Sequence, residues 1–121
     1  MTDDRIPFAH DAVLTMDGGD ERAPGGAITT ALCGSWSHDP PCPLAPHFTG
    51  ATRNGREVTL RVLFAAAATD EDEVRRRIDD ALARGEGEDP DGMRTYWDVV
   101  RAGPSPVAPG ELEHAQRLTR S

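Results

Sequence analysis

Lysine is absent from this chain of 121 residues, in which all 13 cationic side chains are arginine. Without lysine, the chain has neither a lysine Schiff base nor a lysine general base. Aromatic residues make up only 5% of the chain. No apolar run approaches the roughly 18 residues of a membrane-spanning helix. These absences predict one small core and no membrane span.

Acidic residues exceed basic ones by 21 to 13, which leaves a formal net charge of −8. This balance, without a basic stripe, argues against binding to nucleic acid. An acidic surface attracts cationic ligands instead. Residues 1–5 lack the basic and apolar regions of a secretion signal, so we expect a cytoplasmic protein. The bias towards Ala, Gly, Pro and Arg, against Lys and Asn, indicates a GC-rich genome of actinobacterial type.

Turn-forming residues and apolar alternation predict the strands. Ile28, Leu32 and Trp36 alternate with smaller residues and predict a half-buried strand over 27–36. Asn54-Gly55 predicts a two-residue hairpin in which Arg53 lies opposite Arg56 and Ala51 opposite Val58. The apolar side of this hairpin is predicted to hold Val58, Leu60, Val62 and Phe64.

Helical periodicity follows the hairpin. A helix is predicted between a capping box at Thr69 or Asp70 and a stop at Gly85. Its apolar stripe is Val74, Ile78, Ala81 and Leu82. A second helix is predicted from Asp91 to the residue before Gly103, burying Met93, Trp97 and Val100, with a short third helix after Pro109.

The domain organisation follows from these elements. We expect one domain over 1–121, with a loosely structured N-terminal arm over 1–26 and a Pro-rich spacer over 103–110 before the C-terminal helix. The fold class is α+β: a small antiparallel sheet of three or four strands with two or three helices on one face. The spacer and the small core favour a dimer, with exchange of elements between chains as one form of it.

Both cysteines and two histidines gather in a short segment with the spacing C-x4-H-x3-C-x4-H. Two thiolates and two imidazoles suit tetrahedral zinc, so a zinc-binding regulatory module is one hypothesis. Against it, no C-x2-C knuckle is present and four prolines stiffen the segment. A disulfide between the cysteines is a second alternative, and two ordinary half-buried thiols are the default. The four residues are Cys33, His38, Cys42 and His47.

Signals for catalysis are few. Cys42 lies between Pro41 and Pro43, and Pro43 cannot donate a backbone N–H to an oxyanion. His38 and His47 are the best general bases of the chain and its fallback catalytic residues. No glycine-rich nucleotide-binding motif is present, and we expect no cofactor.

Aromatic and arginine side chains predict a binding cleft between a sheet face and the proline-stiffened segment. Its partner would be a peptide or a small molecule. The candidate lining residues are Trp36, Phe48, Tyr96 and Trp97, with Arg53, Arg56 and Arg61 near the rim.

In size, in composition and in its lack of catalytic motifs, the chain resembles the lysinoalanine-forming proteins of the cinnamycin and duramycin lanthipeptide pathways. The resemblance implies a cofactor-free dimer that folds a peptide so that the peptide's own hydroxy-aspartate serves as base while a lysine adds to dehydroalanine. Positioning alone can supply several kcal/mol of barrier lowering. The rival hypotheses are the zinc-binding module and a non-catalytic dimeric binding protein.

Overall fold

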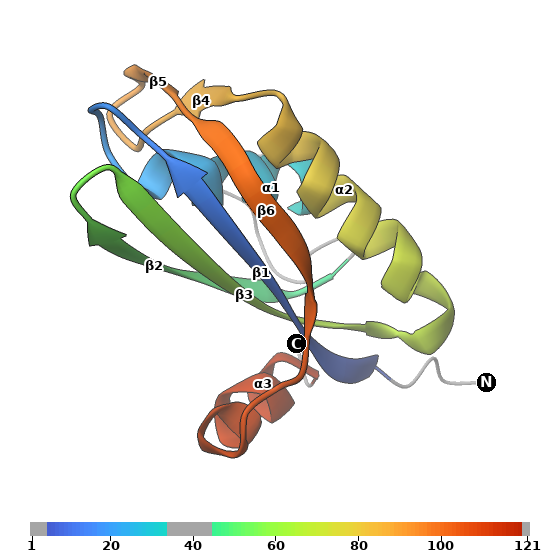
Figure 1. Cartoon of the computed structure of the whole chain (residues 1–121). Coiled ribbons are helices and arrows are strands. Elements are labelled where there is room, and N and C mark those ends of the chain that lie inside the picture. Colours follow the sequence, from blue (N-terminus) through green and yellow to red (C-terminus); the bar gives the residue numbers. More distant parts are fainter. Residues whose placement is uncertain (1–4, 34–44, 120–121) are drawn as a thin grey trace.

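The computed structural model describes residues 5–33 and 45–119. Four strands form one antiparallel sheet in the order β2-β3-β1-β6, and two short strands form a separate β4-β5 hairpin (Figure 1). The elements are β1 (Arg5–Thr15), α1 (Arg22–Cys33), β2 (His47–Asn54), β3 (Glu57–Ala67), η1 (Ala68–Asp70), α2 (Glu71–Ala83), β4 (Glu86–Glu88), β5 (Arg94–Tyr96), β6 (Asp98–Ser105), η2 (Pro109–Glu111) and α3 (Leu112–Thr119).

The topology is the split βαβ arrangement of ferredoxin-like folds. Helix α1 leads from β1 to β2 and α2 leads from β3 towards β6, so each helix crosses one strand of the sheet. Both helices cover the same face (Figure 1). The predicted α+β class with an antiparallel sheet is confirmed, and the β4-β5 hairpin and α3 are additions to the basic topology.

The core lies between α1, α2 and the sheet. Even-numbered side chains of β1 and β3 lie on the face that packs against the helices, and Leu14, Leu60 and Phe64 among them are fully buried. Ile28 of α1 and Ile78 of α2 complete this layer. None of the helices in the described part of the chain is long and apolar enough to span a membrane.

The expected strand over 27–36 was wrong, because residues 22–33 form α1. Ile28 and Leu32 are buried, and a separation of four residues places them on one face of a helix as readily as on one face of a strand. Asp20 starts the helix: its carboxylate accepts the backbone N–H of Arg22 at 2.9 Å, and its carbonyl accepts that of Ala23 at 3.0 Å.

The N-terminal segment also differs from the expectation of a loosely structured arm over 1–26. Residues 5–15 form β1, an inner strand that pairs with both β3 and β6. Ala9 and Val13 are buried on the face opposite the core, so β1 has apolar side chains on both faces. Alternation is weak in such a strand, and this explains the error.

The expected helix from Asp91 to Gly103 was wrong too, since this segment forms β5 and β6. Met93, Trp97 and Val100 have helical spacing, but only Trp97 is buried. Thr95, Tyr96, Trp97, Val99 and Val100 are β-branched or aromatic, which favours strands. Because β6 continues to Ser105, the spacer before η2 is reduced to residues 106–108.

The Asn54-Gly55 hairpin is present with its register shifted. Asn54 pairs with Glu57, so Gly55 and Arg56 are the central residues of the turn, and Ala51 lies opposite Leu60 rather than Val58. Gly55 has a φ of 64°, and among the described residues only glycines have positive φ. A glycine at the first central position is typical of a type II′ turn. A shift of two residues keeps every side chain on its predicted face.

Helix α2 has the predicted apolar stripe, with Val74, Ile78, Ala81 and Leu82 all buried. The predicted capping box is absent: Asp70 is the N-cap, but its side chain makes no capping hydrogen bond. Gly85 ends the helix as expected, with a φ of 72° and its N–H bonded to the Leu82 carbonyl.

The predicted third helix is confirmed as α3, on the sheet face opposite α1 and α2. Ala115 of α3 is fully buried, and the His114 ring lies 4.8 Å from that of Phe48, which points away from the core. Glu111 of η2 binds Arg61 on the same face. Helix α3 covers one end of this face and leaves the other end open (Figure 1).

Candidate functional site

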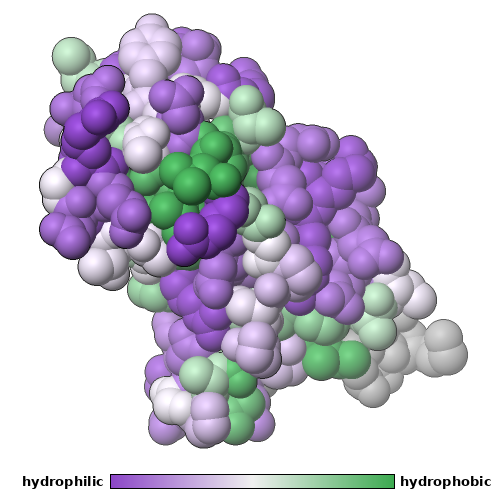
Figure 2. Space-filling view, in the orientation of Figure 1, coloured by the Kyte–Doolittle hydropathy of each residue, from purple (hydrophilic) through white to green (hydrophobic). Residues whose placement is uncertain are grey.

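A cavity of about 920 Å³ lies where the C-terminus of α2, the β4-β5 hairpin and the ends of β1 and β6 meet. Its wall includes Thr15, Gly85, Thr95, Tyr96, Trp97 and Val99. The neighbouring surface is apolar, since Val99 and Val100 are 39% and 55% exposed. Figure 2 shows this apolar area in green, over the upper part of β6 in the orientation of Figure 1.

The hairpin is attached to α2 through Gly85 and Trp97. The Trp97 N–H donates to the Gly85 carbonyl at 2.9 Å, and the indole N–H donates to the Leu82 carbonyl at 2.9 Å. A Cβ on Gly85 would lie 3.0 Å from the Trp97 carbonyl, so this close approach requires glycine. Trp97 is 4% exposed, and it therefore belongs to both the core and the cavity wall.

Charged side chains line the cavity in pairs, with two exceptions. Asp17 binds Arg56 at 2.6 Å, and Glu86 binds Arg94 at 3.3 Å. Arg84 and Asp98 line the same cavity, yet neither forms an ion pair or a side-chain hydrogen bond with any part of the chain that the structure describes.

A second hollow of about 650 Å³ adjoins the first, and Gly19, Arg94 and Thr95 line both. Thr95 is only 3% exposed, and its hydroxyl has no hydrogen-bond partner among residues 5–33 and 45–119. The second hollow also contains Asp20, whose pKa is lowered by its hydrogen bonds from Arg22, so this carboxylate is charged at neutral pH.

The cavity holds two of the predicted binding residues. Tyr96 is 63% exposed on its wall, and Trp97 lies beside it in the chain. Arg56, expected near the rim, lines it as well. Phe48 is 49% exposed but lies on the opposite side of the sheet, against His114. Trp36 lies outside the described residues.

Arg53, a predicted binding residue, is instead held by backbone carbonyls. Its guanidinium donates to Gly55 at 3.0 Å, to Gly19 at 2.8 Å and to Met16 at 3.3 Å. These bonds join the β2-β3 turn to the loop after β1. Arg53 thus shapes the loop that carries part of the cavity wall and does not line the cavity itself.

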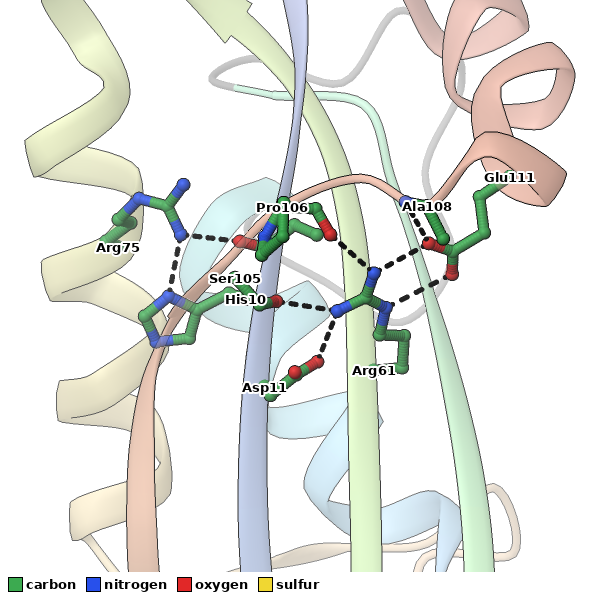
Figure 3. A network of polar contacts seen from close by, with 9 residues as sticks. His10, Asp11, Arg61, Arg75, Ser105, Pro106, Ala108 and Glu111 are labelled. Carbon is green, nitrogen blue, oxygen red and sulfur yellow. Dashed lines mark hydrogen bonds and ion pairs between the residues drawn. The ribbon is translucent and has the colours of Figure 1, made fainter.

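Arg61 is likewise committed to structural contacts (Figure 3). Its Nε and one Nη2 hydrogen donate to the two oxygens of Glu111 at 3.1 and 2.6 Å. Nη1 donates to Asp11 at 2.9 Å and to the Ser105 hydroxyl at 2.6 Å, and Nη2 also donates to the Pro106 carbonyl at 2.8 Å. These five bonds use every N–H of the guanidinium. They attach the segment that leads to α3 to three strands.

His47, a fallback catalytic residue, lies on β2 against α1. Its Nδ1 lies 3.1 Å from the Ala45 carbonyl, which can only accept, so we assign the proton to Nδ1. Nε2 then accepts the Thr29 hydroxyl at 2.9 Å. Neither residue lines the cavity. His38, Cys42 and the side chain of Cys33 lie outside the described residues, so the predicted Cys/His metal cluster does too.

His10 is a buried histidine to which the sequence assigns no partner. It is 1% exposed, and Arg75 donates to its Nδ1 at 3.0 Å. Its Nε2 therefore carries the proton and donates to Asp79 at 2.7 Å. Arg75 also lies 5.3 Å from the Phe64 ring centre. This cluster attaches β1 to α2 and is structural.

The cavity presents carboxylates, guanidinium groups and aromatic side chains, which can bind a charged ligand. Its described lining includes no histidine and no cysteine. Within the described ranges, no group of three or more His, Cys, Asp or Glu side chains is placed to hold a metal ion. Comparison with family models, curated proteins and solved structures gave no match. The cavity geometry is thus the basis for assigning a function.

Proposed function

We propose that the chain is a small, cofactor-free tailoring protein that holds a flexible, lysine-bearing peptide in the cavity and its adjoining hollow. It would preorganise that peptide for an intramolecular lysinoalanine cross-link. The observation that carries the proposal is the pair of adjoining hollows, with the exposed Tyr96 ring on the wall of the larger one. Their size suits a segment of peptide, since ligand pockets typically measure about 300–1,000 Å³.

Charge supports a cationic ligand. The two hollows together are lined by more carboxylates than guanidinium groups. The carboxylates belong to Asp17, Asp20, Glu21, Glu86, Asp89 and Asp98, and the guanidinium groups to Arg22, Arg56, Arg84 and Arg94. The exposed face of Tyr96 adds a cation–π surface for an ammonium group. A lysine side chain fits this combination of charge and aromatic surface.

The reaction needs no cofactor. The lysine nitrogen forms a bond to the β-carbon of dehydroalanine, the α-carbon gains a proton, and the nitrogen loses one to a base. No electron is transferred to or from the chain. In this proposal the peptide's own hydroxy-aspartate serves as the base, and the protein contributes positioning.

Binding tests the proposal first. A peptide that contains lysine and dehydroalanine is titrated into the wild type and into Tyr96→Ala, followed by calorimetry. We expect Tyr96→Ala to weaken binding about tenfold through loss of the cation–π contact. Phe48→Ala is the matched control, because Phe48 is also an exposed aromatic residue but lies on the other sheet face. Equal weakening by both variants would contradict the cavity as the binding site.

A cross-linking assay tests the second part of the proposal, which is the tailoring reaction. The addition leaves the mass unchanged, so it is followed as loss of thiol-reactive dehydroalanine. Wild-type protein should accelerate this loss without added metal or cofactor. Peptide binding with no acceleration would refute the tailoring role and leave a binding protein.

A further inference from the structure

We propose that the cavity recognises a zwitterionic part of its ligand, with Asp98 receiving a cation and Arg84 receiving a carboxylate. The inference rests on the proposed function and deepens it, because it states which chemical groups of the peptide enter the cavity. It depends on the placement of Arg84 and Asp98, on their lack of partners in the described chain and on the Thr95 hydroxyl, which is available on the cavity wall.

The register of the hairpin places Arg84 and Asp98 next to each other. Glu86 lies opposite Tyr96 in the β4-β5 pairing. The hydrogen bond from the Trp97 N–H to the Gly85 carbonyl continues the same register by one residue. Arg84 and Asp98 are the next positions along the two segments. Their backbones are therefore adjacent, although they are 14 positions apart in the sequence.

These two opposite charges do not pair with each other. Arg84 is the C-cap of α2 and retains helical φ and ψ of −63° and −25°, whereas Asp98 is the first residue of an extended strand. No nitrogen of Arg84 comes within 4.0 Å of a carboxylate oxygen of Asp98 or of any other described acidic residue. The other charged side chains on the described cavity wall are all in ion pairs.

A ligand that carries both charges satisfies both side chains at once. A guanidinium binds a carboxylate through two parallel hydrogen bonds, and a carboxylate binds an ammonium group through a charge-assisted hydrogen bond. Tyr96 lies two residues before Asp98 on the same wall and can cover the cation. A ligand with only one of the charges leaves one side chain unpartnered.

Thr95 supplies an independent reason to place a ligand here. Its side chain is more than nine-tenths buried, lines the cavity and has no hydrogen-bond partner in the described chain. Thr49 has the one buried side-chain hydroxyl that lacks a partner in the described chain, so the Thr95 hydroxyl is in contact with solvent on the cavity wall and is available to a ligand. A peptide N–H or C=O between the two charged groups of the ligand would bond to it.

Two kinds of peptide carry the required pair of charges. One is a C-terminal basic residue with a free carboxylate, and the other is an internal pair of an acidic and a basic side chain. Four short acetylated peptides separate them: one ending in lysine acid, its amide, one ending in norleucine acid, and an amide with an internal aspartate and lysine. Each is titrated into the protein and followed by amide chemical shifts.

We expect a zwitterionic peptide, either the lysine acid or the internal pair, to bind at least about tenfold more tightly than the lysine amide or norleucine acid. The stronger of the two identifies the source of the charges. In Arg84→Gln, a peptide with the carboxylate should bind no more tightly than the matching peptide without it, while the effect of the cation remains. In Asp98→Asn, a peptide with the cation should bind no more tightly than one without it, while the effect of the carboxylate remains. Arg101→Gln is the control, because Arg101 is an exposed β6 arginine outside the cavity lining.

Three results would overturn the inference. They are equal binding of all four peptides, no effect of Arg84→Gln and Asp98→Asn, and an equal effect of Arg101→Gln. In each case the proposed function stands if Tyr96→Ala still weakens binding of the lysine and dehydroalanine peptide. If neither that peptide nor the short ones bind, both proposals are refuted. All three substituted positions are exposed, so the variants should remain folded.

Discussion

Replacing Arg61 with methionine removes five hydrogen-bond donors from the contact between the sheet and the segment that leads to α3. The two carboxylates left behind, Asp11 and Glu111, are 44% and 27% exposed and regain water. Partly exposed ion pairs contribute about 1 kcal/mol each. The bonds to the Ser105 hydroxyl and the Pro106 carbonyl contribute about 0.5 kcal/mol each. We therefore expect Arg61→Met to lower the free energy of unfolding by about 2–3 kcal/mol.

Urea unfolding followed by circular dichroism measures this loss, and limited proteolysis shows where it acts. Cleavage should begin in residues 106–111, because these residues lose their attachment to the sheet. Arg76→Met is the matched control: Arg76 binds Glu73 at 2.6 Å, as close as Arg61 binds Glu111, but is 61% exposed on α2. The control should change stability by less than about 0.5 kcal/mol. If both variants unfold at the same urea concentration, the reasoning about Arg61 is refuted.

Three further outcomes follow from other contacts. Hydrogen bonding from Arg61 lowers the pKa of Glu111 to about 2, so this pair stabilises the fold fully above about pH 4.5 and loses its effect as pH falls towards 2. The stability gap between wild type and Arg61→Met should therefore narrow by about 1 kcal/mol over that range in a urea titration. Gly55→Val should lower the free energy of unfolding by about 1–3 kcal/mol, because valine is strained at a φ of 64°; an unchanged melting temperature would contradict the turn. Trp97→Phe should cost about 1 kcal/mol through the lost bond to the Leu82 carbonyl and Trp97→Ala about 3–5 kcal/mol, and equal losses in thermal melts would show that packing contributes nothing.

The sequence was sufficient to predict an element where its apolar residues fit either the helical period or the alternation of a strand, but not both. The stripe of α2 at Val74, Ile78 and Leu82 fits a helix, and the alternation from Val58 to Phe64 fits a strand. Ile28 and Leu32 fit both, and the choice between them depended on Asp20 capping the helix and on burial against α2. Tertiary packing resolved this ambiguity, which local pattern alone could not.

The candidate site was less predictable, because it depends on pairing between distant residues. Tyr96 and Trp97 could be chosen by residue type alone. Arg84 and Asp98 could not, since nothing in their local sequence distinguishes them from other surface charges. They become neighbours only through the β4-β5 register, in a segment for which a helix was predicted. Arg61 was misassigned for the related reason that Glu111, its partner, is 50 residues away.

The position of β1 in the sheet determines the order in which the chain can fold during synthesis. His10 pairs with Val62 on one side and with Pro104 on the other, so β1 gains its neighbour β6 only after β3, α2 and the β4-β5 hairpin have been synthesised. Contacts between residues so far apart in sequence slow folding. Until β6 pairs with β1, the unpaired edge of β1 is exposed to other nascent chains. A product that ends before residue 98 would leave this edge exposed permanently.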